Sequence, residues 1–124
     1  MQSRPIALVV ALALSSFVLA GQAGKQLTPE EAKLERLKKG YVAAKAKYTK
    51  QPKNANLKRN YVEATVAYGN AMMTSPALSA KVKYPGALRL YREALKLDPK
   101  HKVALANKKT IEDIYKGMGR EIPK

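Results

Sequence analysis

The spacing of the apolar residues after Thr28 constrains this chain more than any other feature. They recur every three or four positions in a sequence dense in Ala, Leu, Lys and Glu, and no stretch alternates long enough for a strand. A period of three to four places apolar side chains on one face of an α-helix. We therefore expect the all-α fold class, with about four antiparallel helices whose core is built largely of Ala, Leu and Tyr.

Local signals predict the ends of the first two helices. Thr28 and Glu31 form the pattern of a capping box, with Pro29 at the first helical position. Pro52 disfavours a helical residue before it, so we expect the first helix to end near Gln51. The second helix is expected from near Asn54 to Met72 or Met73, both interpreted as packing residues. The predicted apolar stripes are Leu34, Leu37, Tyr41, Ala44 and Tyr48 on the first helix, and Leu57, Tyr61, Ala64 and Tyr68 on the second.

Two further helices are expected towards the C-terminus. Residues 74–84 contain Pro76 and no sustained period, which predicts a connecting loop with room for one helical turn. Pro85 is predicted to start the third helix, which ends at Asp98-Pro99. The fourth should cover 102–116 and stop at Gly117 and Gly119. The predicted apolar stripes are Leu88, Tyr91 and Leu95 on the third helix, and Val103, Ala106, Ile111, Ile114 and Tyr115 on the fourth.

The first 23 residues have the layout of a secretory signal peptide. Arg4 precedes an apolar run from Ile6 to Ala20, and small residues follow at Gly21 and Ala23. The run is shorter than the ~20 apolar residues that span a bilayer, so a cleaved leader is favoured over a membrane anchor. We expect residues 1–23 to be removed, with cleavage after Ala20 or Ala23. A helical domain over 24–124 would then be exported to the periplasm or secreted.

The charge of the chain is strongly positive. Lys and Arg number 24 against 9 Asp and Glu, a net charge of +15, and removal of Arg4 with the leader lowers it to +14. A run without any acid lies between Arg36 and Val62, and a second basic group follows residue 95. The run comprises Arg36, Lys38, Lys39, Lys45, Lys47, Lys50, Lys53, Lys58 and Arg59, and the second group Lys96, Lys100, Lys102, Lys108, Lys109, Lys116 and Arg120. Two interpretations stay open: solvated faces over a small core, or a footprint for an anionic partner.

Composition argues against most chemistry. The chain has no cysteine and one histidine, so disulfides, thiolate nucleophiles and zinc–cysteine sites are excluded. His101 has only Asp98 nearby and is interpreted as a solvated turn histidine, not a metal ligand. Ser75 and Ser79 lie in no recognisable nucleophile–base pattern. We therefore expect no enzymatic activity, no catalytic residues, no metal and no cofactor.

An internal pattern adds a resemblance to a known family. Tyr recurs seven apart at 41 and 48, 61 and 68, and 84 and 91. The segment over 84–101, YPGALRLYREALKLDPKH, resembles the second helix of a tetratricopeptide repeat (TPR), with small Ala87, aromatic Tyr91, an Ala-Leu pair and a closing Asp-Pro. Residues 52–69 fit a first-type helix, but about 13 inserted residues before Tyr84 depart from the family pattern. A generic four-helix bundle with a chance match is the alternative.

The resemblance implies a short α-solenoid of TPR-like helix-turn-helix units. In that family the first helix of each repeat lines the binding groove, which here corresponds to Asn56, Arg59, Glu63 and Val66, and less strongly to Ala106, Thr110 and Asp113. Glu63, where the family's carboxylate-clamping version has Asn, argues against that specialised ligand.

Two hypotheses for function follow. The first is an exported, non-enzymatic interaction module that binds a protein or peptide partner, with self-association as a further option for so short an array. The alternative is a basic module that binds anionic polymers or membrane surfaces, such as nucleic acid, cell-wall polymers or lipid head groups. Nucleic acid is the less favoured of these, because no nucleic-acid motif is present and the tyrosines lie on predicted buried stripes.

Overall fold

The structure is a computed structural model that describes residues 24–124, so the expected signal peptide over 1–23 lies outside the described residues. The described part consists of four helices without a strand: α1 (Pro29–Lys50), α2 (Ala55–Thr74), α3 (Ala80–Leu97) and α4 (Lys102–Gly117). This confirms the all-α prediction. Within residues 24–124 no helix combines the length and the apolar character needed to cross a membrane.

The start of α1 follows from the predicted capping box, its end from the backbone turn at Gln51, and the start of α2 from a side-chain cap at Asn54. The Thr28 hydroxyl accepts from the Glu31 N–H at 3.2 Å, and the Glu31 carboxylate accepts from the Thr28 N–H at 2.8 Å. α1 ends at Lys50, with Gln51 as its C-cap before Pro52. The Asn54 side chain then accepts from two backbone N–H groups in the first turn of α2.

The third helix begins earlier than the sequence suggested. Ser79 is the N-cap of α3, and its carbonyl accepts from Val82 N and Lys83 N at 3.0 and 2.9 Å. Pro85 therefore lies inside α3 instead of starting it, and the loop is shorter than 74–84. Proline has no N–H to donate to the carbonyl four residues earlier, which here is that of Lys81. Because Lys81 is exposed, water can donate a hydrogen bond to this carbonyl instead.

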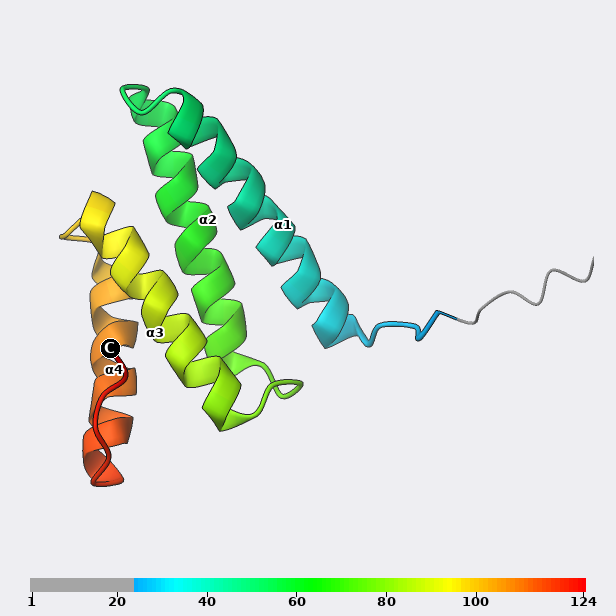
Figure 1. Ribbon diagram of the computed structural model, residues 1–124, viewed down its shortest axis with the longest axis vertical. Helices are drawn as coiled ribbons and strands as arrows, with labels where there is room; N and C mark the ends of the chain where they lie inside the picture. Colours follow the sequence, from blue (N-terminus) through cyan, green and yellow to red (C-terminus); the bar gives the residue numbers. More distant parts are fainter. Residues whose placement is uncertain (1–23) are drawn as a thin grey trace, which may run out of the picture.

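The bounds of α4 match the prediction to one residue, but its buried face differs. Ala104 and Ile111 are fully buried, whereas Val103 is 46% exposed and Ala106 is exposed, so these two were wrongly assigned to the apolar side. Gly119 has φ 64° and closes the helix: its N–H binds Lys116 O, and the next N–H binds Tyr115 O. These two bonds form a Schellman motif, and the tail then runs back along α4 (Figure 1).

α2 is the central helix and is covered on two sides (Figure 1). It packs against α1 and, more extensively, against α3, while α4 packs mainly against α3. The predicted stripe of α2 faces α1, and a second face carries the buried residues Val62, Val66 and Gly69. α2 and α4 run in the same direction, because Glu63 contacts His101 and Asn70 contacts Asn107. The core cluster consists of Tyr41, Tyr61, Val62, Val66, Met72, Ala87, Leu88, Leu90, Tyr91, Ala94, Ala104 and Ile111.

Candidate functional site

The groove residues suggested for α2 do not form one surface. Asn56, Arg59 and Glu63 are exposed, and the Arg59 guanidinium donates to the Asn56 side-chain oxygen. Val66 is only 3% exposed and belongs to the core cluster. Its assignment to a groove is therefore corrected: α2 buries a second face against α3, which a single stripe does not reveal.

The corresponding polar residues of α4 form their contacts within their own helix. Ala106, Thr110 and Asp113 are exposed. The Thr110 hydroxyl donates to Ala106 O at 3.0 Å, and Asp113 pairs with Lys109 at 2.6 Å. A hollow of about 370 Å³ does bring Arg59 and Glu63 together. Its lining residues are Ala55, Lys58, Arg59, Val62, Glu63, Leu97 and Asp98, and it includes no residue of α4.

His101 is not a solvated turn histidine, contrary to the sequence interpretation. It is the N-cap of α4, where its Nδ1 accepts from the Ala104 N–H at 3.2 Å, and its side chain is only 12% exposed. Because Nδ1 is the acceptor, Nε2 carries the hydrogen and donates to Glu63 at 3.1 Å. His101 thus links α4 to α2. Among residues 24–124 no three His, Cys, Asp or Glu side chains are grouped to hold a metal ion.

Glu93 of α3 is a carboxylate shared by three helices. Its side chain is 19% exposed and accepts from the Tyr41 hydroxyl at 2.9 Å, from the Tyr61 hydroxyl and from Lys45 Nζ at 2.9 Å. Burial raises the pKa of Glu93, but the hydrogen bonds from Tyr61, Lys45 and Tyr41 together outweigh burial and leave the pKa below its ordinary value. Glu93 is therefore ionised and held in place.

The partners of Glu93 keep complementary protonation states. Burial, followed by the hydrogen bond to Glu93, raises the pKa of Tyr61, so its phenol stays neutral. Hydrogen bonds to Glu93 and then Tyr41 raise the pKa of Lys45, so its ammonium stays charged. The rings of Tyr41 and Tyr61 meet edge to face with centroids 6.2 Å apart, and Tyr48 meets Tyr61 at 5.4 Å. Tyrosines of the seven-residue pattern thus pack α1 on α2 and position Glu93.

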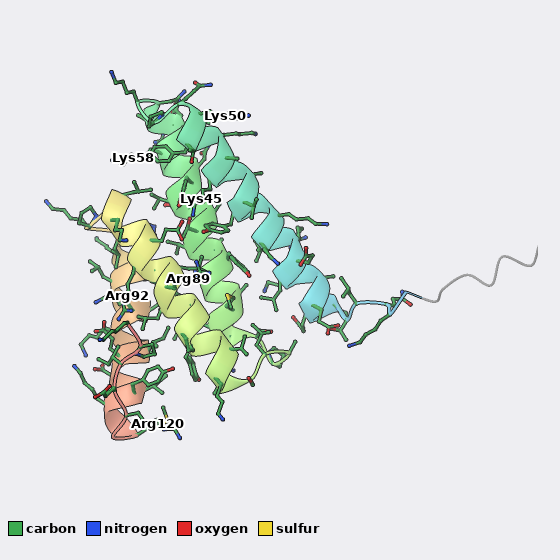
Figure 2. The ribbon with its side chains drawn as sticks, in the orientation of Figure 1. Lys45, Lys50, Lys58, Arg89, Arg92 and Arg120 are labelled. Carbon is green, nitrogen blue, oxygen red and sulfur yellow. The ribbon has the colours of Figure 1, made fainter. Side chains whose placement is uncertain are left out.

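A basic hollow of about 400 Å³ opens beside Glu93. Its lining residues are Lys45, Arg89, Arg92, Glu93, Lys96 and Lys124. Lys45 and Arg89, labelled in Figure 2, come from α1 and α3, which lie on either side of α2. Arg92 donates to Pro123 O at 2.7 Å and so ties the returning tail to α3.

The sequence alone did not point to Arg89, Arg92 or Lys124 as binding residues. The first two lie with Lys96 at spacings of three and four on the outer face of α3, a signal that was available. Lys124 reaches the hollow only because the chain reverses at Gly119, which no local pattern near Arg89 indicates.

A second, apolar hollow of about 450 Å³ lies where the first half of α1 faces the start of α3. Its lining residues are Leu27, Glu31, Leu34, Glu35, Lys38, Tyr68, Met72, Leu78 and Val82. Leu27 and Val82 are about half exposed, at 50% and 52%. The surface between α1 and α3 therefore carries both an apolar and a basic hollow; we call this surface the α1–α3 trough.

The sequence matches no protein-family model, and no curated protein or solved structure matches it.

Proposed function

We propose that this chain is an exported, non-enzymatic interaction module, with a short TPR-like helical array that binds another protein. The α1–α3 trough carries the proposal, because it carries two hollows that are large enough for side chains of a partner, one lined by apolar and the other by basic residues. The burial of Tyr91 between helices is consistent with the repeat register. The parallel course of α2 and α4 supports the same arrangement.

Capture followed by reconstitution tests this proposal. The purified, immobilised chain is incubated with an envelope extract at low and at high salt, and each retained protein is then purified and titrated against the chain. A protein that is retained at high salt and binds with saturable, one-to-one stoichiometry supports the proposal, because a packed interface is less salt-dependent than diffuse charge attraction. Retention only at low salt, without saturation, contradicts it.

A second candidate function is binding to anionic polymers or membrane surfaces. One observation favours it: all nine basic residues from Arg36 to Arg59 are exposed. Lys45 alone among them pairs with an acid in the described part of the chain, through Glu93. The remaining cations of the run are therefore available to phosphate, sulfate or carboxylate groups.

Charge reversal separates the second candidate from simple solvation. The variant Lys38→Glu/Lys39→Glu/Lys47→Glu/Lys50→Glu leaves the Lys45–Glu93 contact intact. Its matched control reverses four exposed lysines elsewhere: Lys81, Lys100, Lys102 and Lys116. If the run is a footprint, only the first variant should bind heparin and short DNA more weakly, and its salt dependence should flatten by about one log–log unit for each phosphate that the variant no longer binds. Equal effects in the two variants would show that the net charge of the surface, and not the Arg36–Arg59 run itself, governs this binding.

A further inference from the structure

We infer that the α1–α3 trough binds an acidic peptide segment of a protein partner that also carries an apolar anchor residue. This inference rests on the proposed protein-binding function and names the chemistry of the partner. The acidic part would occupy the basic hollow and the apolar side chain the hollow at the start of α1.

The charge of the basic hollow selects an anion. Apart from Glu93, every residue that lines it is basic. The Glu93 carboxylate already accepts from Tyr41, Tyr61 and Lys45, so its charge is compensated within the fold. The Arg89 side chain is 64% exposed, with one guanidinium nitrogen 3.8 Å from Glu93, and a guanidinium can bind a carboxylate of a partner in a bidentate geometry.

The apolar hollow gives the trough a second, different requirement. Leu34, Tyr68, Met72 and Leu78 are partly or wholly buried around it, and Val82 is half exposed at its edge. A compact polyanion or a lipid head group would leave this surface uncovered, whereas a peptide can place an apolar side chain there. Hollows of about 450 and 400 Å³ can also take up side chains of a peptide, which a flat membrane surface does not offer.

The two hollows are close enough for one short segment. On α1, Lys38 lines the apolar hollow and Lys45, seven residues later, lines the basic hollow. On α3, Val82 and Arg89 line the two hollows in the same way, again seven residues apart. Seven helical residues cover about 10 Å, which an extended peptide crosses in about three residues. Glu31 and Glu35 border the apolar hollow and repel acids, so the acidic end is directed to the basic hollow.

The partner is a different protein and not a second copy. The sequence has neighbouring acids only at Glu30-Glu31 and Glu112-Asp113. Glu31 belongs to the capping box, Asp113 pairs with Lys109, and Glu112 pairs with Lys108 at 2.8 Å. Neither site is an accessible extended acidic segment, so the chain does not supply the ligand that its own trough requires.

Fluorescent peptides of defined composition test the inference on the purified full chain. The probes are Glu-Glu-Glu-Gly-Gly-Leu-Leu and its reversed sequence, because the trough does not fix the chain direction. Two comparison peptides replace the three Glu with Gln or the two Leu with Ser. We expect saturable binding of one Glu-Leu orientation, at least about fivefold tighter than either comparison peptide.

Paired variants locate the binding site. Val82→Asp in the apolar hollow is matched by Val42→Asp, because Val42 is 54% exposed on α1 and lines neither hollow. Arg89→Glu in the basic hollow is matched by Arg36→Glu, exposed on α1. Each trough variant should weaken peptide binding at least about fivefold and each control less than about twofold. Circular dichroism checks that all four variants keep their helices.

Several results would overturn the inference. Equal losses in the trough and control variants would show general charge or folding effects. Binding of the Ser-containing peptide as tight as that of the Leu-containing peptide, together with displacement by heparin, would indicate an anionic polymer site instead. If a partner is captured and reconstituted but does not compete with the peptide, the proposed function stands and the trough assignment fails.

Discussion

Tyr91 shows how one side chain can serve both packing and polar pairing. It is the largest fully buried side chain among residues 24–124, and its hydroxyl donates to the Asn70 side-chain oxygen at 2.7 Å. The Asn107 amide donates to the same oxygen at 2.8 Å and to the Tyr91 hydroxyl at 3.2 Å. This network joins α2, α3 and α4. A buried hydroxyl or amide is stable only where it has a hydrogen-bond partner, so each of the three side chains helps to hold the other two helices in place.

Two substitutions at Tyr91 should separate these roles. Tyr91→Ala should lower the free energy of unfolding by about 3 to 5 kcal/mol, because it leaves a cavity between α2 and α3. Tyr91→Phe should cost only about 1 kcal/mol, because the ring remains and Asn70 keeps its bond to Asn107. Urea unfolding of the two variants measures the difference, and equal stabilities for Ala and Phe would contradict the packing role.

The protonation of Glu93 should couple stability to pH. Its pKa is lowered in the fold, since the hydrogen bonds from Tyr61, Lys45 and Tyr41 outweigh burial. A carboxyl with a depressed pKa adds stability that is present above its ordinary pKa of 4.5 and is lost as the pH falls through the folded value. The protein should therefore become less stable as the pH drops below 4.5.

Glu93→Gln tests this coupling. Loss of the charged acceptor should lower the free energy of unfolding at pH 7 by about 2 kcal/mol, and the remaining stability should depend less on pH below 4.5. Urea unfolding at pH 7 and at about pH 3 provides the measurement, and Glu121→Gln in the exposed tail is the control. An unchanged acid dependence in Glu93→Gln would mean that other carboxyl groups account for it.

At the scale of elements, the position of α2 between α1 and α3 depends on a close approach at Gly69. A Cβ at this position would lie 3.0 Å from Tyr91 Cε1 and 3.4 Å from Leu90 Cβ. Both neighbours are fully buried, so neither can move without disturbing the core. At Gly40 of α1, by contrast, a Cβ would meet nothing within 4 Å.

Ala substitutions at the two glycines should therefore change the stability of the protein in opposite directions. Gly69→Ala should destabilise the protein by about 1 to 2 kcal/mol, because overpacking against Tyr91 exceeds the gain in helix propensity. Gly40→Ala should stabilise it by about 0.5 to 1 kcal/mol through the unfolded chain's reduced freedom. Thermal unfolding should show a lower midpoint for the first variant and a higher one for the second. A stabilising Gly69→Ala would refute the close approach.

At the scale of the whole molecule, a small apolar core is combined with a strongly positive surface. In the described part of the chain, four helices bury a single apolar cluster, while the cations from Arg36 to Arg59 remain at the surface. Charge of one sign keeps the molecule soluble and attracts anionic partners. Under the two proposals above, the outer cations would bind anionic polymers and the trough a defined peptide segment.

Export is the prediction that concerns the entire chain. The arrangement of Arg4, the apolar run from Ile6 and the small residues at Ala20 and Ala23 predicts that the exported form begins at Gly21 or Gly24. Intact-mass measurement of exported material distinguishes these two starts. Membrane-bound protein that retains Met1 would show that the leader is an anchor.

Local chemistry made the ends of most helices predictable from the sequence. The capping box at Thr28, the Asn54 cap and the end of α3 before Asp98 each depend on residues within one turn of each other. The seven-residue recurrence of Tyr likewise marked residues that pack between helices, such as Tyr41 and Tyr61. A pattern of this kind depends only on the helical period, which the order of the residues already contains.

The tertiary structure alone decided what the helix faces meet. Tyr41 and Glu93 are 52 residues apart in sequence, and His101 and Glu63 are 38 apart, so no local window could pair them. The burial of Val66 likewise depends on contacts with a neighbouring helix. Periodicity gives each helix its apolar face but not its neighbour, because the neighbour depends on packing and on long-range polar pairs that form only when the chain is folded.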